Sequence, residues 1–359
     1  MGAAPSRSAP PPQPPLSELQ AACVGYARRV AAAAPLVHCY SNFVAMDLMA
    51  NALLAAGASP AMVHSPDEAA DFTRLASALL VNMGTRSPAW EESMRHSIGA
   101  ARARGTPWVL DPVGCGATPA RTAVTCELAR LGPAVIRGNA SEVMALAAAV
   151  LGADGGGARP KGVDSAHGSS EAEPAARALA AALRTVVAVT GAVDFATDGA
   201  TTVYAGNGTP LCTRVTAAGC ALTAVLAAFL AARPPRPEGG EGAAADGDRS
   251  ETVLAAAAAM AYFGLAAQWA HHTAAAAAAA AHPAQQRRPV VVVGPGTLRV
   301  GLLDALHALS SGGAWGECAA VHRGGARRLD SLLRLTADPA EAARWRREAA
   351  EARGDGGVW

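Results

Sequence analysis

The sequence predicts an α/β protein of three layers, in which helices cover both faces of a mostly parallel sheet. Short apolar runs alternate with helical segments of about 10–15 residues along the first half of the chain, which is the pattern of strands joined by crossover helices. The chain has 359 residues, of which 51% are hydrophobic, so it can fill one large core. A hairpin signal appears only after residue 191, where the parallel part of the sheet is expected to end.

The first half of the chain supplies the parallel strands and their helices. Ser17 and Gln20 have the spacing of a capping box, which predicts a helix from there to about residue 33. Strands are then expected at residues 36–39, 61–64, 78–81, 108–110, 134–136 and 186–189. The helices between them are expected at residues 42–56, 66–76, 88–103, 139–151 and 172–183, with Gly57 and Gly105 as two of the stops.

In the second half, strands and helices no longer alternate regularly. Residues 194–197 and 202–204 flank an Asp-Gly-Ala-Thr turn and predict an antiparallel hairpin. Core helices are then expected at residues 219–232, 252–281 and 298–309. Residues 253–270 carry no formal charge, but they are mostly alanine and include Gln268. This stretch therefore predicts a buried helix rather than a membrane span.

Composition divides the chain into a central domain and less regular parts. Residues 1–16 form a Pro-rich tail expected to be disordered, and residues 17–312 form the main domain. Residues 152–162 and 233–250 are expected to be disordered insertions, because they are rich in glycine, proline or acidic residues. Residues 313–359 form an extension to which the sequence assigns no role; it includes a charged helix at 339–352 capped by Asp338.

Charge and residue usage exclude several classes of protein. The net charge of +1 argues against nucleic acid as the main ligand, because a phosphate-binding surface usually needs a basic excess. Lys161 is the only lysine, and Gly162 follows it, so the chain has neither a phosphate-binding P-loop nor a protein-kinase lysine. Any phosphate chemistry must rely on arginine, backbone N–H groups and a metal.

Cysteine usage and the N-terminus bear on the compartment. The seven cysteines form no C-x-x-C pair, which is typical of free thiols in a reducing compartment and predicts a cytoplasmic protein. The first residues formally match a myristoylation pattern at Gly2, but a floppy tail is the simpler interpretation. Arg7 and Ser8, with no acid before Glu18, leave an organelle-targeting segment as the alternative.

Polar residues stand where the parallel strands end, which is where ligands bind in such sheets. Asp111 follows the strand at 108–110 and opens a Gly-rich turn, so its carboxylate can hold Mg²⁺ or simply cap the next helix. Arg137 ends the next strand, and a guanidinium suits multidentate phosphate binding. Asn139 and Glu142 share the first turn of a helix, where they form either a capping box or part of a site.

A second group of small and polar residues precedes the helix at 219–232. Thr190 ends a strand just before the hairpin, and Ala217, Ala218, Gly219 and Cys220 form a small-residue turn into the helix. A helix N-terminus offers unpaired N–H groups and a partial positive charge, which could stabilise a phosphoryl group during transfer. The same charge is expected to lower the pKa of the Cys220 thiol.

In order and spacing, these segments resemble the hydroxyethylthiazole kinases of thiamin salvage, which belong to the ribokinase-like superfamily. The resemblance covers about residues 18 to 310, and its most specific motifs are D-P-V-G-C-G-A-T-P at 111–119 and I-R-G-N-A-S-E at 136–142. Further segments that carry it are residues 35–38, 41–42, 50–54, 57–62, 80–85 and 294–297. The resemblance implies a ribokinase-like α/β/α fold and ATP-dependent phosphorylation of the hydroxyl of 4-methyl-5-(2-hydroxyethyl)thiazole.

The resemblance also implies roles for particular residues, Mg²⁺ as cofactor and a homotrimer with sites between subunits. Its partners would be the thiazole alcohol and ATP, with neither nucleic acid nor a membrane. Carried over residue by residue, it implies Arg137, Thr190 and Asn139 for ATP, Asp111 and Glu142 for the metal, Met62, Ala217 and Asn42 for the alcohol, and Gly219 with Cys220 for catalysis. Cys220 stands where sugar kinases of the superfamily carry an aspartate base.

One departure from the family pattern leaves alternatives open. The family's loop usually reads T-G-[TAS]-G-C, whereas this chain has Ala217 at the first glycine. If Ala217 must take a positive φ, the strain costs on the order of 1 kcal/mol, and its Cβ would crowd the substrate. A related enzyme acting on a pyrimidine alcohol or a hydrated nicotinamide nucleotide is one alternative. A catalytically impaired binding protein of the same fold is the other.

Overall fold

The computed structural model describes residues 17–152, 168–234, 244–280, 293–312, 320–322, 325–327 and 333–354. The predicted N-terminal tail lies outside the described residues. So do residues 153–162 of the first predicted insertion and residues 235–243 of the second.

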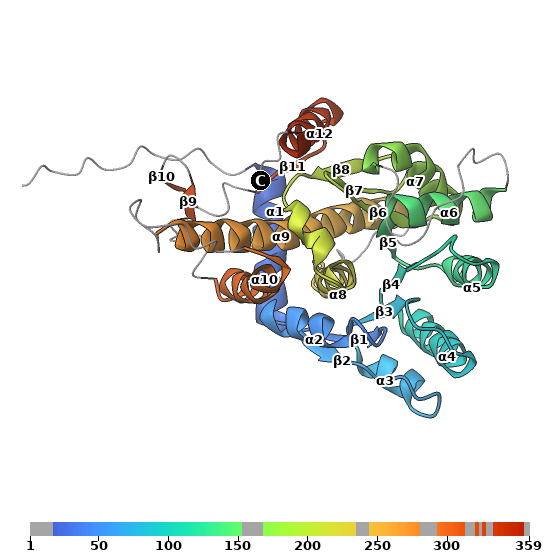
Figure 1. Ribbon diagram of the computed structural model, residues 1–359. Coiled ribbons are helices and arrows are strands. Elements are labelled where there is room, and N and C mark those ends of the chain that lie inside the picture. The colour runs from blue at the N-terminus through green and yellow to red at the C-terminus, as the bar shows by residue number, and fades with distance from the viewer. Residues whose placement is uncertain are drawn as a thin grey trace, which may run out of the picture.

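A nine-stranded sheet runs through the molecule (Figure 1). Its strands, in spatial order, are β11 (Leu335–Thr336), β8 (Thr202–Ala205), β7 (Asp194–Thr197), β6 (Val186–Thr190), β5 (Val135–Asn139), β4 (Trp108–Asp111), β3 (Ala78–Asn82), β1 (Leu36–Tyr40) and β2 (Ser59–Ala61). The strands from β2 to β6 are parallel, and β7, β8 and β11 each pair antiparallel with their neighbour. This confirms the mostly parallel sheet and the change to a hairpin after residue 191.

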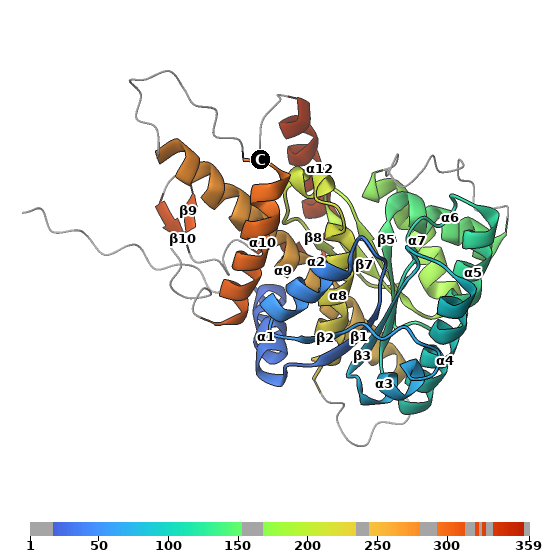
Figure 2. The same ribbon diagram turned by 60° about the horizontal axis from the view of Figure 1, so that its bottom comes forward.

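Helices cover both faces of the sheet and complete the predicted three layers (Figures 1 and 2). One core lies beneath α1 (Glu18–Ala33), α2 (Met46–Ala55), α8 (Ala218–Ala231), α9 (Ala244–Ala280) and α10 (Pro295–Ser310). The other lies beneath α3 (Ala69–Leu75), α4 (Pro88–Arg104), α5 (Pro119–Ala129), α6 (Ala140–Leu151), α7 (Ser169–Leu183) and α12 (Pro339–Gly354). Alternate residues of the central strands contribute to the two cores; in β3, for example, Leu80 joins the first core and Leu79 the second.

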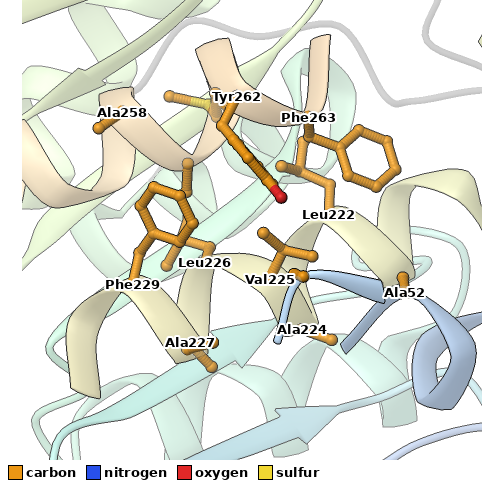
Figure 3. Close-up of a cluster of buried hydrophobic side chains, with 14 of the residues drawn as sticks. Ala52, Leu222, Ala224, Val225, Leu226, Ala227, Phe229, Ala258, Tyr262 and Phe263 are labelled. Carbon is orange, nitrogen blue, oxygen red and sulfur yellow. The ribbon is translucent and has the colours of Figure 1, made fainter. Parts of the chain in front are cut away.

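The packing of α8 against α9 forms the centre of the first core (Figure 3). Tyr262 and Phe263 of α9 reach toward apolar side chains of α8, and the rings of Tyr262 and Phe229 lie with centroids 5.3 Å apart. Among the described residues, one helical stretch, Asp248–Ala277, is long and apolar enough to cross a membrane, and 83% of its most apolar window is buried. The stretch therefore packs as the buried helix that the sequence predicts.

The structure differs from the predicted elements in several places. Residues 244–250 are not part of a disordered insertion but form the first turns of α9, where Asp248 pairs with Arg233 at 3.2 Å. The strand expected at 61–64 is β2 at Ser59–Ala61, because it pairs in parallel register with β1. Two short strands, β9 (Ala320–His322) and β10 (Gly325–Arg327), form a separate antiparallel pair.

The C-terminal extension is part of the fold, although the sequence shows no role for it. β11 adds to the sheet edge by pairing with β8, and α12 covers the same edge. A Cβ on Gly206 would lie 2.5 Å from the ring of Trp345, so only glycine lets this ring approach the backbone. The extension thus covers an edge that would otherwise present unpaired backbone groups.

The importance of the α8–α9 core can be measured by a pair of leucine substitutions. Leu226 is fully buried in this core, whereas Leu75 is 72% exposed. We expect Leu226→Ala to lower the free energy of unfolding by about 2–5 kcal/mol, because it removes packed methyl groups and leaves a cavity. Leu75→Ala serves as the control and should change it by no more than about 0.5 kcal/mol. Urea unfolding followed by circular dichroism gives both values, and equal effects would contradict the packing described.

Candidate active site

The candidate site lies at the carboxyl ends of the central strands, and the topology explains why. The chain runs from β1 outward to β2 and then returns to β3 on the other side of β1, so the connections diverge between β1 and β3. Open α/β sheets bind ligands where the strand order reverses in this way. Asn82, Asp111 and Thr190 end β3, β4 and β6 at this edge, and Asn42 lies two residues beyond β1. Arg137 does not end its strand as predicted, because β5 continues to pair with β6 as far as Asn139; it is the middle residue of β5. The N-terminal part of α8 meets these side chains through Cys220 and Thr223.

Arg137 is the buried cation of the site. Its Nη2 donates to Thr190 Oγ1 at 2.7 Å, and its Nη1 lies 3.5 Å from Thr223 Oγ1. Its Nε is buried and has no hydrogen-bond partner within the described part of the chain. A Cβ on Gly219 would come within 2.9 Å of Nη1, so this glycine lets the start of α8 approach the guanidinium. The structure therefore brings Arg137, Thr190 and Gly219 together.

Asp111 extends the same network toward Cys220. Its Oδ2 accepts hydrogen bonds from Thr223 Oγ1 and from Asn82 Nδ2, both at 2.9 Å. Burial raises the pKa of the Asp111 carboxyl, and the positive charge of Arg137 and the two hydrogen bonds oppose this shift. Asp111 therefore does more than cap the next helix, which is instead capped by Thr118.

Glu142 and Asn139 form the capping box that is one of the two interpretations of their spacing. The Asn139 side chain accepts from the Glu142 N–H at 2.9 Å, and Glu142 Oε2 accepts from the Asn139 N–H at 3.0 Å. The other carboxylate oxygen of Glu142 accepts from the N–H of Gly114 at 2.9 Å, which fixes the Gly-rich turn after Asp111. Burial first, and then the charge of Asp111, raises the pKa of Glu142. The two acids therefore lie near one another.

Cys220 lies at the other end of the network, and the prediction that the pKa of its thiol is lowered is wrong. Its Sγ accepts from Asn82 Nδ2 at 3.2 Å and from Asn42 Nδ2 at 3.6 Å. Burial, followed by the negative charge of Asp111, raises the pKa of the thiol to about 12, whereas the helix N-terminus alone was expected to lower it. Desolvation and the nearby carboxylate outweigh the helix end, and Cys220 is a neutral thiol at neutral pH.

Ala217 adopts the positive φ that is expected because it stands where the loop of the resembling family has a glycine. It is the residue before α8 and has φ 65° in the left-handed region, which glycine enters freely but alanine does not. The conformation costs on the order of 1 kcal/mol, which the packing of the surrounding segment must supply. No side chain caps this end of α8.

The residues predicted for the alcohol reach the network from two segments. Asn42 Nδ2 donates to Asn82 Oδ1 at 3.0 Å as well as to Cys220. Met62 follows β2, and it is tied to the loop after β1 through the ring of His64, which contacts both the Met62 carbonyl and the Ser41 N–H. Asn42 and Met62 therefore lie on two adjacent segments at the same edge of the sheet.

Two residues of this network, and one acid that feels the charge of Arg137, were not assigned a role from the sequence. Asn82 ends β3, and Thr223 lies one turn beyond Gly219 on α8. Asp194 begins β7 and accepts a hydrogen bond from the N–H of Gly191 at 2.8 Å. Burial raises the pKa of Asp194 to about 7. Asn82 follows the same rule as Asp111, since both end buried strands. The sequence does not indicate Thr223, because its position depends on how α8 crosses the sheet.

Comparisons with known proteins show which family the chain resembles. The family model described as the hydroxyethylthiazole kinase family matches residues 27–311. A hydroxyethylthiazole kinase of Cereibacter sphaeroides is 47% identical over 288 residues, which are 80% of this chain and 94% of that protein. One from Zea mays is 45% identical over 281 residues, covering 78% of this chain and 86% of the relative.

A solved structure shows the same arrangement of elements. The hydroxyethylthiazole kinase from Pyrococcus horikoshii superposes with a TM-score of 0.64 at 33% identity, over 88% of this chain and 98% of that one. The sequence match spans β1, β3, β4, β5, β6 and the start of α8, which carry the residues of the site. By sequence and by structure, the chain belongs to the hydroxyethylthiazole kinase family.

Proposed function

We propose that this protein transfers the γ-phosphoryl group of ATP to the hydroxyl of 4-methyl-5-(2-hydroxyethyl)thiazole, a reaction of thiamin biosynthesis and salvage. The observation that carries the proposal is the continuous network that runs from Thr190 through Arg137, Thr223 and Asp111 to Asn82 and Cys220. It joins a phosphate-binding cation to the side chains that face the alcohol. Membership of the kinase family supports the same reaction.

Arg137, Thr190 and the start of α8 would bind the phosphates of ATP. The buried Nε of Arg137 lacks a partner among the described residues, and a phosphate oxygen would provide one. The backbone N–H groups of Gly219 and Cys220 belong to the first turn of α8, where the helix dipole favours negative charge. Asn139 ends β5 and pairs with Thr190 of β6, so it would bind ATP beside Thr190.

Asp111 and Glu142 would hold Mg²⁺ together with phosphate oxygens and water. The two carboxyl groups are buried near each other, and burial raises the pKa of each. A divalent cation would lower both pKa values again, because it stabilises the ionised carboxylates. Among the described residues, no group of three or more His, Cys, Asp and Glu side chains could hold a metal alone. This donor set fits Mg²⁺, which usually keeps several waters and shares its ligands with phosphate. When bound, the ion neutralises charge on the phosphates.

Cys220 would position the attacking hydroxyl rather than remove its proton as a thiolate. Phosphoryl transfer depends chiefly on positioning and electrostatic stabilisation, so it does not require a strong base. The neutral thiol is held by Asn82 and Asn42, which fix the position of Sγ beside the start of α8. Met62, Asn42 and Ala217 would surround the thiazole ring.

We also propose a homotrimer in the cytoplasm, on the family resemblance and the cysteine usage. Phe43, Val44 and Leu54 are 72%, 67% and 59% exposed, and large apolar side chains of this kind are suited to contact with another subunit. Size-exclusion chromatography with light scattering would test the oligomeric state.

A coupled assay of ADP release with Mg-ATP and the thiazole alcohol tests the function directly. We expect ADP release that depends on the alcohol, and a phosphorylated thiazole as product by mass spectrometry. Turnover only with a pyrimidine alcohol or a hydrated nicotinamide nucleotide would instead indicate a related enzyme. Binding of ATP without turnover on any alcohol would indicate a binding protein of the same fold.

Replacing Cys220 separates positioning from general-base catalysis. Because burial raises the pKa of Cys220 to about 12, the thiol stays protonated as the pH rises through neutrality, and turnover should not increase through its ionisation. We expect Cys220→Ser to slow turnover by less than the ~10²–10⁴-fold that a general base contributes, and to leave ATP binding unchanged. The measurements are kcat across the pH range and ATP affinity by calorimetry. An unchanged kcat would remove Cys220 from the mechanism.

Replacing Ala217 by glycine tests the effect of the strained turn. Ala217→Gly removes a Cβ from a left-handed residue beside the substrate, so we expect a lower KM for the alcohol and a free energy of unfolding that rises by about 1 kcal/mol or less. Ala34 has φ 43° at the end of α1, so Ala34→Gly is a matched control. The control should change stability in the same sense but leave the KM alone. An equal change of KM in both variants would contradict this explanation.

A further inference from the structure

His64 makes two hydrogen bonds that fix its protonation. Its Nδ1 lies 3.1 Å from the Met62 carbonyl oxygen, and its Nε2 lies 3.3 Å from the backbone nitrogen of Ser41. A carbonyl oxygen only accepts and a backbone N–H only donates, so Nδ1 must carry the proton and Nε2 must accept. The ring is therefore neutral, in one tautomer, and it bridges two separate segments of backbone.

Aromatic neighbours hold the ring of His64 in this orientation. It stacks on Trp90 of α4 with ring centroids 4.3 Å apart and an interplanar angle of 26°. On another side it meets the edge of Tyr40, with centroids 5.4 Å apart. The phenol oxygen of Tyr40 is in turn fixed by Ser93 at 2.5 Å and Ser97 at 3.0 Å. The ring thus has little freedom to turn away from its two backbone partners.

Both segments that His64 joins carry residues proposed to contact the alcohol. Ser41 directly precedes Asn42, whose amide donates to Asn82 and to Cys220 Sγ. On the other side, the ring binds the carbonyl of Met62 itself. The next carbonyl, that of Val63, is bound by Nε2 of the buried His38 at 2.8 Å. Two histidines therefore bind successive carbonyls of the segment after β2, and the hydrogen bond from the Ser41 N–H to His64 connects this segment to Ser41.

We propose that His64 is a positioning residue for the alcohol substrate, which acts by holding Met62 and Asn42 at a fixed separation through its two hydrogen bonds. This inference rests on the proposed function, because it assigns the alcohol to the space between these two segments. His64 does not itself touch the reacting atoms. Its loss should therefore weaken binding of the alcohol much more than that of ATP, whose phosphates bind at Arg137 and Thr190.

Three substitutions of His64 separate its hydrogen bonds from its packing. His64→Phe keeps a ring against Trp90 but removes both hydrogen bonds. His64→Asn places an amide near the position of Nδ1 and can still donate to Met62, whereas His64→Gln places one near Nε2 and can still accept from Ser41. His96, which is exposed on α4, provides the matched control His96→Ala.

The readout is the KM for each substrate and kcat, with circular dichroism to show that each variant is folded. We expect His64→Phe to raise the KM for the alcohol by about 10-fold, since each hydrogen bond contributes modestly and two are lost. His64→Asn and His64→Gln should each raise it by about 2- to 5-fold, because each retains one hydrogen bond. The KM for ATP should stay within about 2-fold in all variants, and His96→Ala should match the wild type.

The result separates this inference from the proposed function. If the wild type phosphorylates the alcohol and the folded Phe variant has an unchanged alcohol KM, His64 is only a packing residue and the inference fails. Equal rises in the KM for both substrates would also overturn it, since they would indicate general loosening of the site. If His64→Phe does not fold, the Asn and Gln variants decide the question by the same comparison. Absence of turnover in the wild type would instead contradict the proposed function.

Discussion

The burial of one guanidinium is the constraint on which the rest of the site depends. Arg137 is 7% exposed, and within the described residues its Nε has no partner. A buried charge is stable only when polar groups surround it, and Thr190, Thr223 and, through Thr223, Asp111 do so here. The close approach of α8 at Gly219 follows from the same need, because a side chain there would collide with the guanidinium.

The charges at this edge of the sheet do not balance within the protein alone. Two carboxyl groups, those of Asp111 and Glu142, are buried near Arg137. Burial raises the pKa of both, and the negative charge of Asp111 raises that of Glu142 further. An arrangement of this kind is costly in the free protein and favourable once a divalent cation and phosphate oxygens enter it. The structure of the site is therefore explained better by its ligands than by the stability of the fold.

The sequence predicted that these charged and polar groups lie together, because parallel strands bring the residues at their carboxyl ends to one edge of the sheet. Asp111 and Thr190 end buried parallel strands, and such ends converge in a sheet of this topology. Arg137 was predicted as a strand end but lies two residues before the end of β5, still close enough for its side chain to reach Thr190. Asn82 also ends a buried strand, but an amide is a weaker signal than a charge. Thr223 depends on the way α8 crosses the sheet, which no local pattern encodes.

One wrong prediction and one feature that the sequence did not predict have the same physical origin. The pKa of Cys220 was predicted from the helix end, a local feature, whereas burial and Asp111 decide it. The pairing of β11 with β8 joins residues more than 100 positions apart, and a two-residue strand leaves no periodic signal. In both cases the deciding contacts are between segments that are distant in sequence, so patterns along the chain do not reveal them.

The two halves of the site differ in charge, and this difference bears on the substrate. The phosphate side contains Arg137, Asp111 and Glu142, whereas the segments assigned to the alcohol present Asn42, Asn82, a neutral thiol, a thioether and a neutral imidazole. A nucleotide acceptor would bring its own phosphate and would need a cation on that second side. An uncharged heterocycle needs only shape and a few hydrogen bonds with fixed direction. The uncharged side chains named here therefore suit a small uncharged alcohol such as the proposed substrate.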